Sequence, residues 1–244
     1  GSSLYRLPRL YLNDGGGNFS KSQGIPDVFI TGSCVAIADF DKDGDSDIFL
    51  GARTTTWRYG VPPDSYLLVN DGRGYFSIAP SSVTTHLRKF GFVKSATWTD
   101  IDQDEDPDLV IAAEWKPITV LINDSGKFER IQEIGTASGW WNVVTSVDID
   151  GDGDMDLIAG NLGLNSKLKA SADQPVSLYV GDFDRNDSTD HVLTHYMSGR
   201  EYPFHTRDEM TKHMPFLKKR FLSYQKFAET DFEGMFDESA RKQA

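Results

Sequence analysis

Cysteine is nearly absent from this 244-residue sequence, which contains only Cys34. A lone cysteine cannot form an internal disulfide, so a disulfide-stapled scaffold is excluded. Long apolar runs are absent as well. None approaches the roughly 20 residues that a transmembrane helix needs, and no signal peptide is visible. We therefore expect no membrane insertion, and the 39% of apolar residues is enough to build a core.

Positive charge is also scarce, with 25 Lys and Arg against 37 Asp and Glu and a net charge of −12. This balance argues against a nucleic-acid partner and favours cations or basic partners. The acidic residues are concentrated, because 20 of the 37 lie in four nine-residue windows, 39–47, 100–108, 148–156 and 182–190. The windows carry a net charge of −18, and the rest of the chain carries +6.

The windows are copies of one motif, and repeats of this kind define an architecture. The first reads Asp-Phe-Asp-Lys-Asp-Gly-Asp-Ser-Asp and the third Asp-Ile-Asp-Gly-Asp-Gly-Asp-Met-Asp, each followed by an apolar run. A second element recurs between them, in which Asn-Asp and nearby glycines separate an apolar run from an aromatic residue, with the asparagine at positions 13, 70 and 123. Asn-Asp-Gly between apolar runs is typical of a β-hairpin.

The spacing of these signals predicts repeated four-stranded units. One unit is expected from strands 34–38, 48–51, 66–69 and 75–79, and the next from strands 93–98, 109–115, 118–122 and 128–131. Four short antiparallel strands in about 50 residues are typical of a propeller blade. The chain opens with what look like the last two strands of an earlier blade.

The pattern changes to helix from about residue 208. Met210, Met214, Leu217, Phe221 and Tyr224 recur at steps of three and four, and Pro215 suits the first turn of a new helix. The predicted fold is therefore all-β, with about four β-propeller-type units in residues 1–207 and a short helical segment in residues 208–244.

The acidic motif predicts calcium binding. Carboxylates at motif positions 1, 3, 5 and 9 repel one another unless a cation neutralises them, and alternate residues of a tight loop can direct several oxygens at one Ca²⁺. A glycine at position 6 permits the positive φ of a sharp turn, and position 7 is expected to contribute its backbone carbonyl. An EF-hand is excluded, because position 12 is apolar in all four copies (Leu50, Ile111, Ala159 and Leu193) and the flanks resemble strands.

Twenty candidate ligand positions follow: Asp39, Asp41, Asp43, Asp45, Asp47, Asp100, Asp102, Asp104, Asp106, Asp108, Asp148, Asp150, Asp152, Asp154, Asp156, Asp182, Asp184, Asn186, Ser188 and Asp190. The windows 39–47 and 148–156 match every position and rank first. The window 182–190 has Asn186 at position 5 and Asp187 at position 6, and ranks next. The window 100–108 ranks last, because Glu105 replaces the turn glycine. Two calcium sites are expected with more support than the other two.

The acidic loops and the Asn-Asp-Gly hairpins together resemble FG-GAP/VCBS repeats, the units of integrin α-subunit-like β-propellers, over roughly residues 5–200. The stretch Gly160-Asn-Leu-Gly-Leu-Asn165, together with Glu201-Tyr-Pro203, is similar to bacterial relatives of cartilage acidic protein, the ASPIC/UnbV-type group. The resemblance implies a secreted or surface-anchored protein with Ca²⁺ in its blade loops and a role in adhesion or recognition. Complete propellers of this type usually have about seven blades, so a chain with four is a fragment, a truncated product or an open arc.

Two functional classes stay open at this point. The first is a non-catalytic, calcium-stabilised recognition or adhesion module outside the cell, on a bacterial outer surface or in the periplasm, with a protein or glycan ligand. The second is a lectin or the propeller of a secreted polysaccharide-processing enzyme. No nucleophile motif and no carboxylate pair outside the acidic windows supports catalysis, so we expect no enzyme. Open strand edges are expected to pair with the remainder of a propeller or with another chain.

Overall fold

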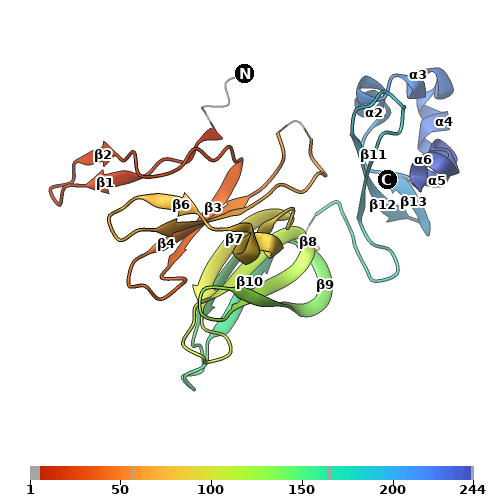
Figure 1. The fold of residues 1–244 in the computed structure, drawn as a ribbon. Coiled ribbons are helices and arrows are strands. Elements are labelled where there is room, and N and C mark those ends of the chain that lie inside the picture. Colours follow the sequence, from red (N-terminus) through yellow and green to blue (C-terminus); the bar gives the residue numbers. More distant parts are fainter. Residues whose placement is uncertain (1–5, 57, 164–165, 243–244) are drawn as a thin grey trace. The chain divides into compact units, whose positions relative to one another are not determined.

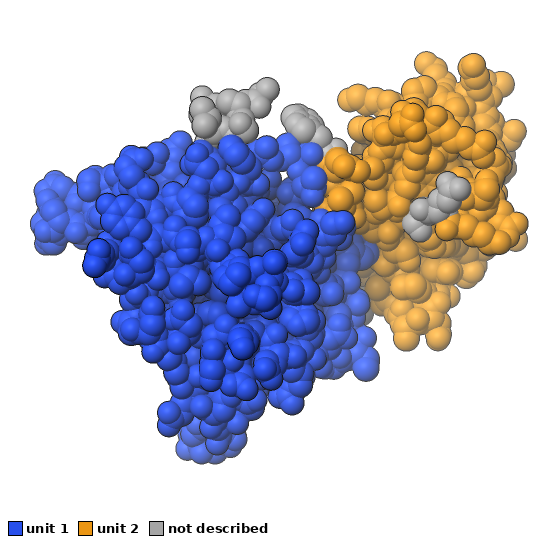
Figure 2. Space-filling view, in the orientation of Figure 1, with its two compact units in different colours: residues 1–56, 62–163 blue, residues 57–61, 164–244 orange. Residues whose placement is uncertain are grey.

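The computed structural model of the chain describes residues 6–56, 58–163 and 166–242. The chain forms two compact units, which Figure 2 shows in different colours. Unit 1 consists of residues 1–56 and 62–163, and unit 2 of residues 57–61 and 164–244. Antiparallel β-sheets dominate and the helices are short, so the predicted all-β class with a helical C-terminal segment is confirmed (Figure 1).

Unit 1 contains a two-stranded ribbon and two four-stranded antiparallel sheets. The ribbon pairs β1 (Tyr11–Asn13) with β2 (Phe19–Lys21). The first sheet has the order β3-β4-β5-β6, with β3 (Gly32–Ala38), β4 (Asp47–Ala52), β5 (Tyr66–Asn70) and β6 (Phe76–Ile78). The second sheet has the order β10-β9-β8-β7, with β7 (Phe92–Thr99), β8 (Asp108–Asn123), β9 (Phe128–Val147) and β10 (Asp156–Asn161). A short helix α1 (Ser81–Thr84) and a 3₁₀ turn (Thr85–Leu87) connect the sheets.

The first sheet agrees with the blade predicted for residues 34–79, but the second sheet corrects the prediction. The strands expected at 109–115 and 118–122 are parts of one strand, β8, and the strand expected at 128–131 continues to Val147. Trp115 adopts a φ of 68°, and the register with β9 shifts on both sides of Lys116. The chain therefore bends without leaving the sheet, and Figure 1 shows β8 and β9 as long curved ribbons.

The main core of unit 1 lies between the two sheets. Alternate residues of β8 explain why the run 109–113 is apolar throughout. Leu109 and Ile111 pack with Phe49 and Leu67 of the first sheet, whereas Val110 and Ala112 pack on the other face toward β9 and β10. A strand that is buried on both faces needs apolar residues at every position. Full burial of each such side chain contributes about 1.5–3 kcal/mol.

In its described residues, unit 2 combines a three-stranded sheet with five short helices. The sheet has the order β11-β12-β13, with β11 (Ser177–Gly181), β12 (Asp190–Met197) and β13 (Arg200–Pro203). The helices are α2 (Arg207–His213), α3 (Phe216–Arg220), α4 (Tyr224–Ala228), α5 (Phe232–Met235) and α6 (Glu238–Arg241). Phe232 is buried and stacks on Tyr179 of β11, with ring centroids 4.2 Å apart, so side chains of the helical segment and of the sheet share one core.

The predicted helical periodicity is divided among three helices, because Met210 lies in α2, Leu217 in α3 and Tyr224 in α4. A capping box between Thr206 and Glu209 starts α2, and Pro215 is the N-cap of α3, as its position predicted. Met210, Met214, Leu217 and Phe221 are buried in the core of unit 2. Tyr224 does not continue this face, because it is 64% exposed and its hydroxyl donates to Asp208. Among the described residues, no helix has the length and apolar character needed to span a membrane.

Candidate metal centre

The four acidic windows form the loops of four β-hairpins. Loop 1 (residues 39–47) joins β3 to β4, loop 2 (100–108) joins β7 to β8, loop 3 (148–156) joins β9 to β10, and loop 4 (182–190) joins β11 to β12. Position 9 of every loop is the first residue of the outgoing strand. The repeated sequence therefore produces a repeated structural position, and the loops can be compared position by position.

The loop backbones share two left-handed residues. The turn expected at position 6 is present in all four loops, with φ of 96° at Gly44, 72° at Glu105, 96° at Gly153 and 62° at Asp187. Position 4 is also left-handed, with φ of 57° at Lys42, 62° at Gln103, 79° at Gly151 and 58° at Arg185. This second turn was not anticipated, because lysine, glutamine and arginine give no signal for positive φ. In loops 2 and 4 the backbone N–H of position 5 also donates to the position-1 carboxylate, at 3.2 and 3.0 Å.

The side chains at positions 1 and 5 hold this backbone in place. The backbone N–H of position 6 donates to the carboxylate of position 1, at 3.0, 2.9, 3.1 and 2.9 Å in loops 1 to 4. The N–H of position 7 donates to the side chain of position 5, at 3.2, 2.9, 2.9 and 2.7 Å. In loop 4 this second acceptor is the amide oxygen of Asn186.

The aspartate at position 9 connects the end of each loop to its beginning through a hydrogen bond. Its Oδ2 accepts the backbone N–H of position 2, at 3.0, 2.9, 3.0 and 3.1 Å in loops 1 to 4. Asp47 and Asp108 are completely buried, and Asp190 is 9% exposed. Burial raises the pKa of these three carboxyls, despite backbone donors that lower it. A buried carboxylate with a raised pKa is one that a nearby cation would stabilise in its charged form.

Carboxylates converge at one point in every loop. In loop 1 the oxygens of positions 1, 3 and 5 lie within 4.8 Å of one another, and in the other loops those of positions 1, 3 and 9 do so. The groups are Asp39, Asp41 and Asp43; Asp100, Asp102 and Asp108; Asp148, Asp150 and Asp156; Asp182, Asp184 and Asp190. Of the other predicted acidic ligands, the structure leaves six outside these groups: Asp45, Asp47, Asp104, Asp106, Asp152 and Asp154.

These groups fit a hard cation such as Ca²⁺. In the described part of the chain, the Oδ1 atoms of Asp39 and Asp184 are buried without a hydrogen-bond partner. A buried acceptor without a partner is unfavourable by roughly 1–3 kcal/mol, and coordination to a cation would remove that cost. Burial, followed by the neighbouring charge of Asp43, raises the pKa of Asp41. The donors are oxygen atoms, as Ca²⁺ prefers, whereas structural zinc sites use thiolates and imidazoles.

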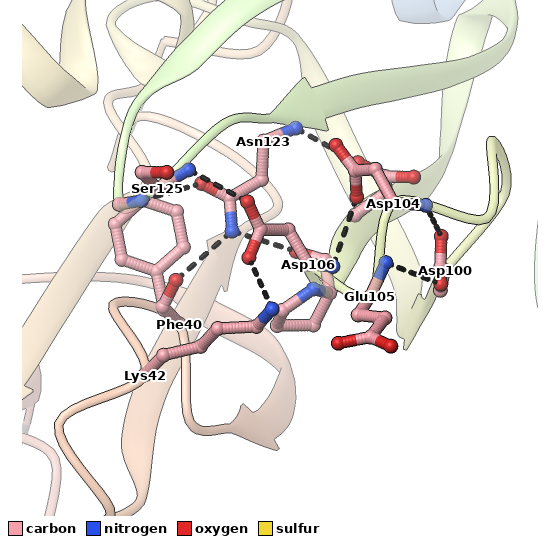
Figure 3. A network of polar contacts seen from close by, with 11 residues as sticks. Phe40, Lys42, Asp100, Asp104, Glu105, Asp106, Asn123 and Ser125 are labelled. Atoms are coloured by element: carbon pink, nitrogen blue, oxygen red, sulfur yellow. Dashed lines mark hydrogen bonds and ion pairs between the residues drawn. The ribbon is translucent and has the colours of Figure 1, made fainter.

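The aspartate at position 7 of loop 2 has a different role from the ligand groups. Asp106 Oδ1 lies 2.8 Å from Nζ of Lys42 in loop 1, and its Oδ2 accepts the N–H of Ser125 at 2.7 Å (Figure 3). The hydrogen bond from Lys42 lowers the pKa of this carboxyl. The Asp106 side chain is therefore engaged with Lys42 and Ser125, and the backbone-carbonyl role expected for position 7 stays a prediction.

The repeated asparagines of the Asn-Asp hairpins belong to the same site, a role that their turn chemistry did not indicate. The backbone N–H groups of Asn70 and Asn123 donate to Oδ1 of the position-9 aspartates Asp47 and Asp108, at 2.9 and 2.8 Å. Their side-chain amides donate to the position-8 carbonyls of the same loops, at 3.2 and 3.1 Å. Each asparagine follows an acidic window, 23 residues after Asp47 for Asn70 and 15 residues after Asp108 for Asn123, and this repeated order was the available signal.

Comparison with protein-family models gives a match to an FG-GAP-like repeat over residues 3–50 and 100–159. These stretches contain loops 1, 2 and 3 and the first and third Asn-Asp hairpins. The chain therefore contains FG-GAP-like repeats. The FG-GAP match agrees with the propeller-like arrangement of four-stranded antiparallel sheets in unit 1.

No curated protein matches the chain. The narrower resemblance to the ASPIC/UnbV-type group stays a prediction, and so does any particular ligand.

Proposed function

We propose that this FG-GAP repeat protein is a calcium-stabilised recognition module that acts outside the cell. The observation that carries the proposal is the common geometry of the four loops. Each uses the same backbone hydrogen bonds to hold three carboxylates together, and loops 1 and 4 retain a buried oxygen without a partner. The residues that would hold the ions are the four convergent groups. Asn186 and the position-7 carbonyls would complete the coordination.

The bound ion would supply charge neutralisation. Three carboxylates within 4.8 Å repel one another, and a divalent cation reverses the sign of their interaction. The loops join neighbouring strands of each sheet, so the ion would stabilise the hairpin rather than take part in chemistry. We propose no enzymatic activity for the chain. Ligand recognition would belong to the sheet faces and loop surfaces of the repeats, with a protein or glycan as ligand.

The kind of site supports an extracellular location. Extracellular modules bind Ca²⁺ with dissociation constants of about 10⁻⁴–10⁻³ M, and a shallow loop with exposed carboxylates suits that range. Asp43, Asp102 and Asp156 are exposed members of their groups. A measured dissociation constant in the nanomolar range would indicate an intracellular buffer instead.

The metal proposal is tested by thermal unfolding with and without Ca²⁺, together with elemental analysis of the purified chain. At a hundredfold excess of ligand over the dissociation constant, one site adds about 2.7 kcal/mol to the free energy of unfolding. At roughly 2–4 °C per kcal/mol, one filled site raises Tm by about 5–11 °C. Mg²⁺ at the same concentration is expected to give a smaller shift, because it demands a stricter geometry and retains its waters.

Asp39→Asn removes one carboxylate of loop 1. Asp27→Asn is the control, because it removes the same charge at an exposed position of unit 1. The first is expected to lose part of the calcium-dependent shift, and the second to keep all of it. An unchanged Tm in chelator, with no calcium found in the protein, would overturn the proposal. For the recognition role, a glycan array followed by turnover assays on the hits separates a binding module from a polysaccharide-processing enzyme.

A further inference from the structure

Loops 1 and 2 are joined directly by an ion pair between a buried carboxylate and a lysine whose side chain is 45% exposed. Lys42 Nζ lies 2.8 Å from Asp106 Oδ1, and the Asp106 side chain is only 9% exposed. Lys42 is position 4 of loop 1 and stands between the carboxylates Asp41 and Asp43, whereas Asp106 stands between Asp104 and Asp108 of loop 2. The ion pair therefore connects the centre of one candidate metal loop to the centre of the next (Figure 3).

The same connection recurs one repeat later. Gln103, at position 4 of loop 2, donates from Nε2 to Oδ1 of Asp154, at position 7 of loop 3. The series ends at loop 3, because Gly151 at position 4 has no side chain. At the other end, Asp45 at position 7 of loop 1 has a buried Oδ1 without a hydrogen-bond partner in the described part of the chain. A contact between position 4 of one loop and position 7 of the next therefore occurs twice in this chain.

Asn123 provides a second connection between loops 1 and 2. Its side-chain amide donates to the carbonyl of Phe40 in loop 1 at 2.9 Å and to that of Pro107 in loop 2 at 3.1 Å, and the residue is fully buried. The hairpin that carries Asn123 also packs on loop 1, since a Cβ added to Gly126 would lie 3.0 Å from Cβ of Asp41. Neither loop can rearrange without disturbing these contacts.

We infer that positions 4 and 7 are positioning residues that couple adjacent calcium loops, so that Ca²⁺ in loop 1 increases the affinity of loop 2. This inference rests on the proposed function. An ion in loop 1 fixes the backbone on both sides of Lys42 and therefore fixes the ammonium group against Asp106. Loop 2 is then already partly ordered when its own ion binds, and a site that is already ordered loses less conformational entropy on binding.

The sign of the effect separates this coupling from simple electrostatics. Through space, an ion in loop 1 repels an ion in loop 2, because both are positive. Direct Coulomb interaction therefore predicts that disabling loop 1 leaves loop 2 with equal or higher affinity. Coupling through Lys42 and Asp106 predicts that disabling loop 1 weakens loop 2.

The test is a Ca²⁺ titration of the full chain followed by ¹⁵N–¹H NMR, with the amides of Gly44 and Glu105 as reporters of loops 1 and 2. Both amides donate to the position-1 carboxylate of their own loop, so they respond to binding there. Asp41→Asn disables loop 1, and we expect the affinity at Glu105 to fall about fivefold, the low end of typical couplings between sites. In a Lys42→Met background, the same Asp41→Asn change is expected to leave the affinity at Glu105 unchanged.

Lys21→Met removes a lysine at an exposed position of β2 and serves as the matched control, in which the fivefold effect must persist. Asp106→Asn is a second variant that breaks the ion pair without altering loop 1, and it must also abolish the effect. Equal weakening of loop 2 with and without Lys42, or no weakening at all, overturns the coupling while leaving calcium binding intact. If wild-type Gly44 and Glu105 do not respond to Ca²⁺, both the coupling and the proposed function fail.

Discussion

The position-9 aspartates allow a quantitative test, because Asp108 and Asp156 differ in burial while occupying equivalent places in their ligand groups. Asp108 is completely buried and accepts two backbone N–H groups, from Ile101 at 2.9 Å and from Asn123 at 2.8 Å. Asp156 is exposed and accepts the N–H of Ile149 at 3.0 Å. The substitution to asparagine keeps one oxygen and replaces the other with a donor.

In Asp108→Asn, one buried backbone N–H faces the new NH₂ group and loses its acceptor. A buried donor without a partner costs about 1–3 kcal/mol, and we expect a net loss of about 2 kcal/mol in calcium-free buffer, or about 4–8 °C in Tm. In Asp156→Asn the remaining oxygen can still accept from Ile149, and the loss is expected to stay within about 0.5 kcal/mol, as for ordinary surface changes.

The assay for this pair is urea unfolding followed by tryptophan fluorescence. Trp98, Trp115, Trp140 and Trp141, four of the five tryptophans, lie in unit 1, so the signal reports mainly the unit that contains both variants. Because each variant removes one member of an equivalent group, the calcium-dependent part of the loss should be similar for the two. Equal losses in calcium-free buffer would refute the claim that position 9 acts as a buried hydrogen-bond acceptor as well as a ligand.

Two further predictions concern pH and backbone strain. Burial raises the pKa of Asp41, Asp47 and Asp108 in the metal-free fold. The metal-free protein therefore gains stability from these groups as the pH falls through the raised pKa values. Over the same range Ca²⁺ must displace more protons in order to bind. The difference in Tm between calcium-loaded and calcium-free protein should therefore shrink between pH 7.5 and pH 5, and a constant or growing difference would contradict the assignment. Glu105 holds a φ of 72° at the place where loop 3 has Gly153, so Glu105→Gly should stabilise unit 1 by about 0.5–1 kcal/mol in chemical denaturation, whereas Gly153→Glu should destabilise it. A loss of stability in Glu105→Gly would show that its side chain makes a contribution larger than the relief of strain.

The sequence was informative where a residue type has one strong physical preference. Glycine at position 6 predicted the left-handed turn of loops 1 and 3, and Pro215 predicted the start of a new helix. The alternating carboxylates predicted groups that converge at positions 1 and 3 in every loop. In each case the residue's own conformational or chemical preference matches what the fold requires at that position.

The rest depends on contacts that no single segment specifies. Nothing near Trp115 distinguishes a turn between two strands from a bend within one, and its positive φ lies where the register of β8 with β9 shifts. Asp106 resembled a ligand-loop residue, and only the position of Lys42, 64 residues earlier in the chain, determines its partner. Long-range contacts of this kind override local propensity, and they decide which of several similar aspartates face the metal.

The connection between position 4 of one loop and position 7 of the next also has a consequence for how such proteins change in length. The repeat that contains loop 2 has both residues, because Gln103 donates to the loop that follows it and Asp106 accepts from the loop that precedes it. Duplication of a whole repeat would copy both halves together and preserve the connections on either side. A deletion that cuts within a repeat would leave one charged side chain without its partner, which favours gain and loss of repeats as complete units.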